Sequence, residues 1–170
     1  AYSIMLTLVG SPVVYYGDEF GKLNDKKYYT EQTQLTGKDD TRFFVRGRID
    51  WKELESNLQD DDNFHTRVYR MIKEMLNTRK QYKVFGRGIT EFIEITDSLT
   101  SEGKHLLSYF RIYNNIKILV INNLSANMVK FENPIPEDDL AVLFPSGFAW
   151  DEKDNAMQLE PFGFAWFLVL

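Results

Sequence analysis

The second half of the chain alternates hydrophobic and polar side chains with a period of two, which is typical of β-strands. Asn114-Asn115 lies between two of these segments, and asparagine tolerates the positive φ of a tight hairpin. Short strands separated by turn residues predict a small antiparallel β-sandwich over residues 86–170. The expected strands are 90–96, 105–113, 116–124, 127–133, 140–144 and 162–170, and the expected turns are 97–98, 102–103, 114–115, 125–126, 134–139 and 151–155.

The first half follows a helical period instead. Apolar residues recur at spacings of three and four between Asn63 and Tyr82, which predicts an amphipathic helix with Asp62 or Asn63 as its cap. Residues 1–9 are expected to be the end of a buried helix, and residues 51–58 could form a short one. We therefore expect a domain boundary near 85–88, with 1–85 and 86–170 as the two parts.

The stretch Gly10–Gly21 holds the most distinctive local pattern. Val13–Tyr16 is a continuous apolar run of β-branched and aromatic residues, which predicts a strand buried on both faces of a parallel sheet. Asp18 and Glu19 follow, where parallel α/β folds place their chemistry. Adjacent carboxylates on a strand point to opposite faces, however, so we expect these two to cap or brace a loop rather than to share acid/base work.

The polar segment 22–49 has no sustained period and is predicted to be a long loop. Its end, 38–51, crowds three arginines with carboxylates and aromatic rings. Arginine can hold a carboxylate through two parallel hydrogen bonds, and sugar sites favour aromatic faces beside planar polar groups. The segment is therefore either an ordinary charged loop or a loop that orients a sugar or a reacting group.

Composition excludes several classes. The net charge of −5 argues against a nucleic-acid partner, because binding phosphates needs a basic stripe. Cysteine is absent, which excludes disulfides and thiolate metal sites. His65 and His105 lie far apart in sequence, so a two-histidine metal site is possible but has no support in the sequence. No membrane span or signal peptide is visible, so a cytoplasmic location is favoured. The chain starts without methionine inside an apolar run, and we expect it to be a fragment of a longer protein.

Several of these motifs carry a family resemblance over the whole chain. Gly10–Glu19 looks like the G-x-P-x-x-Y-x-G-x-E segment on the eighth barrel strand of the α-amylase superfamily, glycoside hydrolase family 13. Residues 23–25, 39–42 and 46–51 resemble the following loop in amylosucrases, and they are also similar to that loop in trehalose synthases and oligo-1,6-glucosidases. Residues 64–88 resemble the last barrel helix, and 159–163 resemble the family's closing C-terminal strand.

The resemblance implies a fold: the last strand and helix of a (β/α)8 barrel in 1–85, then an antiparallel β-sandwich C-terminal domain in 86–170. It also implies retaining cleavage or transfer of α-glucosidic bonds through a covalent glucosyl-enzyme, with no cofactor or metal. The family's Asp nucleophile, Glu acid/base and second Asp follow the fourth, fifth and seventh strands, upstream of Ala1. No catalytic residue is therefore assigned here, and the chain alone is predicted to be inactive.

What the resemblance does assign is substrate contact. Arg46 matches a loop arginine near the sugar pocket of relatives, and Arg42 and Asp40 are the next candidates. The expected partners are an α-glucan or small α-glucoside and the remainder of the parent catalytic barrel.

The rival hypothesis is a non-catalytic carbohydrate-binding or structural β-domain. In a sandwich, an exposed tryptophan could stack on a sugar; the role of Trp150 is left open, since no second aromatic residue lies at matching spacing. Trp166 sits inside an apolar strand and is expected in the core.

Overall fold

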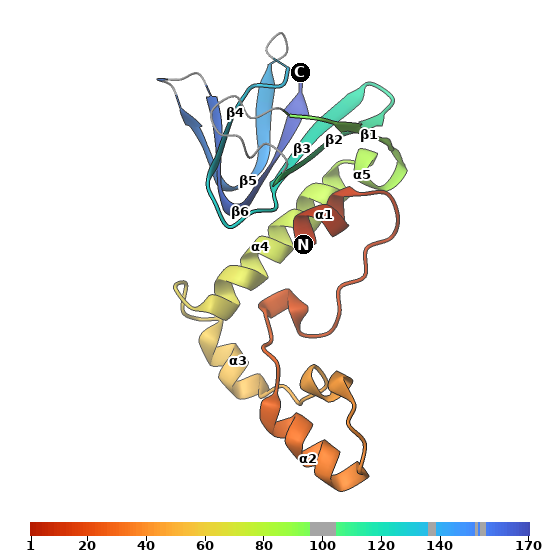
Figure 1. The fold of residues 1–170 in the computed structure, drawn as a ribbon, viewed down its shortest axis with the longest axis vertical. Helices are drawn as coiled ribbons and strands as arrows, with labels where there is room; N and C mark the ends of the chain where they lie inside the picture. Colours follow the sequence, from red (N-terminus) through yellow and green to blue (C-terminus); the bar gives the residue numbers. More distant parts are fainter. Residues whose placement is uncertain (96–104, 136–138, 152, 154–155) are drawn as a thin grey trace. The chain divides into compact units, whose positions relative to one another are not determined.

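The computed structural model describes residues 1–95, 105–135, 139–151, 153 and 156–170. Along the chain, the helices come first and the antiparallel strands follow (Figure 1). The helices are α1 (Tyr2–Thr7), η1 (Asp18–Phe20), α2 (Lys26–Thr36), η2 (Thr41–Phe44), α3 (Trp51–Asn57), α4 (Phe64–Gln81) and α5 (Val84–Arg87). The strands are β1 (Ile89–Ile93), β2 (Leu106–Tyr113), β3 (Ile116–Asn123), β4 (Val129–Glu132), β5 (Leu140–Asp151) and β6 (Ala156–Val169). Within the described residues, no helix combines the length and the apolar character that crossing a bilayer requires.

The chain divides into two compact units. One unit contains residues 1–12 together with 75–170, and the other contains residues 13–74. The boundary expected between residues 85 and 86 stays a prediction about the two parts of the parent protein. The first unit holds the sheet, and the second holds the segment that carries the candidate sugar contacts.

The sheet of the first unit is antiparallel throughout, in the order β1-β2-β3-β6-β4, with β5 paired along β6. Strand β6 connects the sheet, because β3, β4 and β5 all pair with it. Its first residues pair with β4 and its last residues pair with β3 along the same edge, while β5 follows its other edge. The antiparallel prediction is confirmed, and the strands form one continuous sheet that curves around a core.

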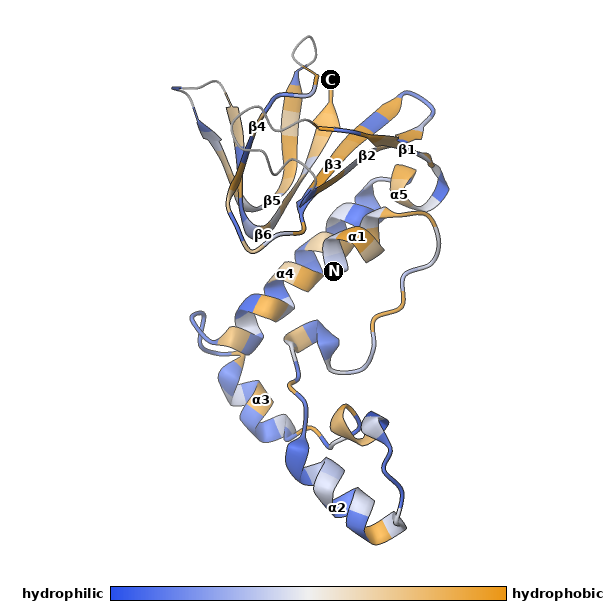
Figure 2. Cartoon of the chain, viewed as in Figure 1, coloured by the Kyte–Doolittle hydropathy of each residue, from blue (hydrophilic) through white to orange (hydrophobic). Residues whose placement is uncertain are grey.

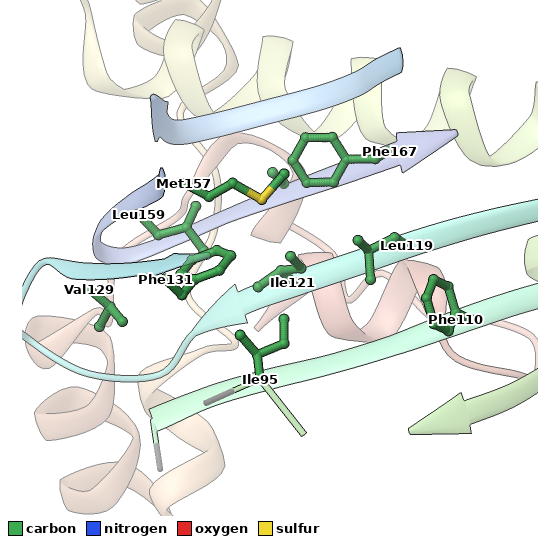
Figure 3. Packing of buried hydrophobic residues seen from close by; sticks show 10 residues of the cluster. Ile95, Phe110, Leu119, Ile121, Val129, Phe131, Met157, Leu159 and Phe167 are labelled. Atoms are coloured by element: carbon green, nitrogen blue, oxygen red, sulfur yellow. The ribbon is translucent and has the colours of Figure 1, made fainter. Parts of the chain in front are cut away.

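The core inside this curve is built from alternate positions of the strands (Figure 3). Leu119 and Ile121 of β3 face it, as do Phe131 of β4 and Phe167 of β6, and each is at most 1% exposed. The remaining buried members of the cluster are Ile95, Phe110, Val129, Met157, Leu159 and Ala165. The period of two in the sequence thus corresponds to one buried face.

The opposite face of the same strands is also buried, because helices cover it. The Trp166 indole donates a hydrogen bond to Ser3 Oγ of α1 at 2.9 Å, and its ring lies 5.4 Å from that of Phe85 in α5. The Tyr109 hydroxyl lies 2.6 Å from Thr7 Oγ1, and burial raises the pKa of Tyr109. Residues 118–121 of β3 and 164–169 of β6 are therefore apolar on both faces, and both strands carry hydrophobic runs in Figure 2.

Arg111 lies at the centre of this helix-covered face and is fully buried. Its Nη2 donates to the carbonyl oxygens of Val84, Phe85 and Gly88, at 3.1, 3.1 and 2.7 Å, and its Nη1 donates to Thr90 Oγ1. These carbonyls belong to α5 and the residue that ends it. The Val84 oxygen also accepts the Gly88 amide at 2.8 Å, while a helix end leaves its last acceptors without donors inside the helix. Burial lowers the pKa of Arg111, because the charged form loses its hydration. One strand side chain thus caps the helix that covers the sheet.

The helical predictions are confirmed at three places. Residues 2–7 form α1, 51–57 form α3, and 64–81 form α4, whose start is capped by Asn63 through a hydrogen bond from the His65 amide at 2.9 Å. The hairpin turn at Asn114 is confirmed as well, with φ at 53°. The turns predicted at 97–98 and 102–103, and parts of those at 134–139 and 151–155, lie outside the described residues.

The strand predicted at Val13–Tyr16 is wrong for this structure. The segment is irregular, Val13 is 77% exposed, and both tyrosines are 46% exposed. A strand needs neighbours to accept its hydrogen bonds, and no described strand pairs with this segment. The apolar run was therefore correctly recognised as unusual but does not lie in a sheet.

The long loop predicted over 22–49 is also wrong, because it contains α2 and η2. Asp25 caps α2 by accepting a hydrogen bond from the Tyr28 amide at 2.8 Å, and Gly37 ends it with φ at 67°. No residue of α2 is buried, so the helix has no apolar stripe for a period to reveal.

Two strands extend further than predicted. Strand β5 continues to Asp151 and β6 begins at Ala156, although Pro161 and Gly163 interrupt the latter's sequence pattern. Phe162 adopts a φ of 58°, and a Cβ on Gly163 would lie 2.9 Å from the Ser146 carbonyl oxygen. The strand bends here, and the close approach needs a glycine.

Candidate functional site

The candidate site lies in the unit formed by residues 13–74, where short elements hold one another through polar contacts. After Tyr16 the chain turns at Gly17, whose φ is 96°, and the amide of Gly17 donates to Glu19 Oε2 at 2.8 Å. Glu19 therefore braces its own turn, as the sequence predicted for this carboxylate.

The segment with the predicted sugar contacts is anchored on α2. The rings of Tyr29 and Phe44 stack with centroids 4.0 Å apart, and the Asp25 amide donates to the Phe44 carbonyl at 2.7 Å. The Tyr29 hydroxyl donates to Asp39, and this bond is the main reason that the pKa of Tyr29 is raised. These contacts fix η2 and the residues before it against α2.

Asp40 and Arg42 form an ion pair at the start of η2. Arg42 Nη2 lies 2.7 Å from Asp40 Oδ2, and Nε donates to Oδ1 at 2.8 Å, so the guanidinium holds the carboxylate with two parallel bonds. Asp40 Oδ1 also accepts a hydrogen bond from the backbone amide of Arg42 at 3.0 Å. These bonds lower the pKa of Asp40 to about 2.

Arg46 is exposed, and its charge is a further, weaker cause of the lowered pKa of Asp40. The three residues predicted from the resemblance are therefore close enough for their charges to interact. Asp40 and Arg42 form an ion pair with each other, and Arg46 is exposed to solvent. Their contact with a substrate stays a prediction.

The same unit also contains a small cavity of about 230 Å³ that the sequence did not predict. Phe20 and Leu54 give it an apolar floor, and Arg48, Glu53 and His65 are among its polar walls. The ring of His65 is oriented by a 2.7 Å hydrogen bond between Nδ1 and the Phe20 carbonyl. The walls could hold a small polar molecule through charged groups of both signs. The sequence holds no signal for it, because its lining residues come from separate stretches of the chain, at 20–23, 48–57 and 65.

Metal chemistry has no visible support in this part of the molecule. Among the residues that the structure describes, no three His, Asp or Glu side chains gather closely enough to hold an ion. The carboxylates whose contacts are resolved in this unit hold backbone amides, arginine, lysine or the Tyr29 hydroxyl.

The pairing of Asp40 with Arg42 predicts a pH dependence. A carboxyl whose pKa is lowered on folding stabilises the fold above its ordinary pKa of 3.8, and that contribution disappears as the pH falls through about 2. We expect the Asp40 carboxyl carbon to titrate near this lower value by NMR. Arg42→Gln should return the pKa towards 3.8, whereas Arg46→Gln should shift it less. An unchanged Asp40 pKa in Arg42→Gln would mean that the pair does not form in solution.

Comparisons with known proteins point to one family, although no protein-family model matches the chain. It is 26% identical over 171 residues to a cyclomaltodextrinase of Geobacillus thermopakistaniensis, covering 99% of this chain and 24% of that protein. It is 29% identical over 147 residues to alpha-amylase 3 of Dictyoglomus thermophilum, covering 82% of this chain and 28% of that protein. A trehalose synthase of Thermus thermophilus is 25% identical over 150 residues, and the match covers 78% of this chain and 15% of that protein.

A solved structure supports the same fold. Trehalose-6-phosphate hydrolase of Bacillus licheniformis superposes with a TM-score of 0.65 over 98% of this chain and 37% of its own, at 18% identity. The chain thus spans about a quarter of the length of the first two curated relatives that it matches.

These findings define the chain as a relative of carbohydrate-active enzymes. More specifically, it is homologous to the C-terminal portion of α-amylase superfamily enzymes, glycoside hydrolase family 13, and the resemblance stated from the sequence is confirmed.

Proposed function

We propose that this chain is the C-terminal portion of a retaining enzyme that cleaves or transfers α-glucosidic bonds and that it carries none of the catalytic carboxylates itself. The observation that carries the proposal is the coverage: the match to the cyclomaltodextrinase extends over 99% of this chain but 24% of the relative. Covalent glycoside chemistry requires a carboxylate nucleophile and a separate acid/base. In the family these residues precede the region that this chain resembles.

The proposed substrate is an α-glucan or a small α-glucoside. The relatives are named cyclomaltodextrinase, alpha-amylase and trehalose synthase, and all three names denote enzymes of glucose-based sugars. The amylosucrase- and trehalose-synthase-like branch is favoured by the loop motif at 46–51. In this proposal the Asp40–Arg42 pair keeps the loop rigid, and Arg46 offers its guanidinium to sugar hydroxyls.

The proposed protein partner is the remainder of a (β/α)8 barrel. Val13, Tyr15 and Tyr16 expose apolar side chains, and Leu23 is 72% exposed. The remainder of a barrel packed on this segment would bury these side chains, because apolar side chains are stabilised when they are removed from water. Residues 1–85 would then be the end of the barrel and residues 86–170 its C-terminal domain.

The direct test is an activity assay of the purified chain. We expect no release or transfer of glucose from maltooligosaccharides, sucrose or trehalose above a buffer control. A full-length family 13 enzyme assayed in parallel gives the positive control. Turnover that survives repeated purification and is lost on substitution of a residue of this chain would contradict the proposal.

A second candidate function is carbohydrate binding by the sheet domain. Trp150 of β5 is 42% exposed and lines a shallow hollow together with Asp151 and Gln158. An exposed indole beside polar side chains can stack on a sugar ring while its neighbours bind the hydroxyls.

Calorimetry with maltooligosaccharides separates the two candidates. Saturable binding that Trp150→Ala abolishes, with the fold retained, would favour the binding domain. Absence of heat for the parent chain would favour a structural portion of a larger enzyme. Tyr113→Ala, which removes another partly exposed aromatic ring of the same sheet, is the matched control and should leave any binding unchanged.

A further inference from the structure

A shallow hollow of about 420 Å³ lies where α4 ends and α5 follows, within the unit that contains the sheet. Its walls carry four cations, Arg79, Lys80, Lys83 and Arg87, and no acidic side chain lines it. Leu76 and Tyr82 provide an apolar side to the same hollow. In a chain whose net charge is −5, this is a local concentration of positive charge.

The position of these cations is explained only in part by the helix dipole. Basic residues in the last turn of a helix interact favourably with its carbonyl end, and Arg79, Lys80 and Arg87 are placed in this way. A dipole provides about half a charge, however, and four cations share this one junction. The dipole therefore does not offset all of this charge, and the exposed groups Lys80, Lys83 and Arg87 are accessible to an anion.

The chain's own carboxylates do not supply it. None of the ion pairs resolved among the described residues involves the four cations. Arg79 donates instead to the carbonyl oxygens of Leu6 and Gly10, the latter at 2.8 Å, and these acceptors are neutral. Its positive charge is thus held in place but not neutralised, and burial lowers its pKa.

A fifth cation, Arg111, lies close enough to Arg79 for their charges to repel. Arg111 is fully buried and donates to the carbonyls of Val84, Phe85 and Gly88 and to Thr90 Oγ1, all of them neutral oxygens. Arg79 and Arg111 also share a neighbour, since Phe85 O accepts from Arg79 Nη1 at 3.5 Å. Two fixed guanidinium groups therefore add their field to that of the exposed cations, and an anion in the hollow would offset the repulsion.

We propose that this hollow binds a phosphate group, either free or esterified to a small sugar. Arginine holds a phosphate through paired hydrogen bonds and lysine through a compact charge, and the hollow offers both. The ring of Tyr82 and the side chain of Leu76 lie on the same walls and would contact the organic part of an ester. The site is independent of the proposed α-glucoside activity, because none of its residues is a candidate sugar contact.

The test is calorimetric titration of the full chain with inorganic phosphate, with glucose 6-phosphate and with glucose. We expect one saturable site for a phosphate compound, no binding of glucose, and weaker binding as salt is raised. The double variant Lys83→Gln/Arg87→Gln should weaken binding by about tenfold, because two of four charges are lost. Both side chains are exposed and neither caps a helix through its side chain, so the fold should be retained, which circular dichroism checks.

The matched control is Lys26→Gln/Lys52→Gln, which removes two exposed charges from the other unit and gives the same net charge. Its affinity should equal that of the parent chain. Tighter binding of glucose 6-phosphate than of phosphate identifies an ester site, and equal affinities identify a free-phosphate site. The proposal is overturned if neither phosphate compound binds, if glucose binds as tightly as glucose 6-phosphate, or if the control loses as much affinity as the test variant.

Discussion

Replacing Arg111 by methionine should lower the free energy of unfolding by about 3 kcal/mol, because the buried carbonyls of α5 and of the residue that ends it lose a charged donor. The guanidinium bonds three carbonyls at the end of α5 and is fully buried. Methionine fills much of the volume but donates nothing. Replacing a complete buried ion pair by apolar residues can be neutral, but here only one partner is removed and the acceptors stay.

Urea denaturation followed by circular dichroism measures this effect. Arg67→Met is the control, since Arg67 is exposed on α4, and it should change the free energy of unfolding by less than about 0.5 kcal/mol. Equal stabilities for Arg111→Met and the parent chain would show that α5 does not depend on the strand for its cap.

Trp166→Ala should be the second large loss, about 3 to 5 kcal/mol, because it opens a cavity beneath the covering helices. Trp166 is fully buried, packs against Phe85 and Phe144, and donates its indole N–H to Ser3. The truncation removes a large side chain and leaves the Ser3 hydroxyl without this donor.

The matched control is Trp150→Ala, which removes the same side chain from an exposed position on β5. It should cost about 1 kcal/mol or less. If the two variants unfold at the same urea concentration, Trp166 is not a core residue, and the conclusion that helices bury this face of the sheet is contradicted.

Most strands could be predicted from the sequence, because residues that alternate between a core and an opposite face leave a period of two. Strand β3 shows the limit of that signal. Ile118, Leu119, Val120 and Ile121 are all fully buried, since the core covers one face and helices cover the other. From the sequence, burial on both faces was predicted for Val13–Tyr16 instead, and that apolar run is largely exposed in this structure.

Two other features could not be predicted, for physical reasons. Helix α2 buries no residue and depends on its caps, so it has no apolar period. Arg111 sits in a strand pattern as an ordinary polar residue, and its acceptors lie more than twenty residues upstream. Long-range contacts of this kind leave no local trace in a sequence.

The predicted sugar contact of the candidate site is not tested by the structure and stays a prediction. Asp40, Arg42 and Arg46 were named from the loop motif, and the structure places their charges close enough to affect one another. The cavity walled by Arg48, Glu53 and His65 was not predicted, because its residues come from separate segments.

The central claim is that this chain is a non-catalytic portion of a retaining α-glucoside enzyme, and its most direct test is covalent trapping. Retaining enzymes form a glycosyl–carboxylate intermediate, which a fluorinated glucosyl fluoride makes long-lived enough for intact-mass spectrometry. We predict that the chain keeps its parent mass while a full-length family 13 enzyme in the same experiment gains one glycosyl unit. A stoichiometric glycosyl adduct on an Asp or Glu of this chain would contradict the account.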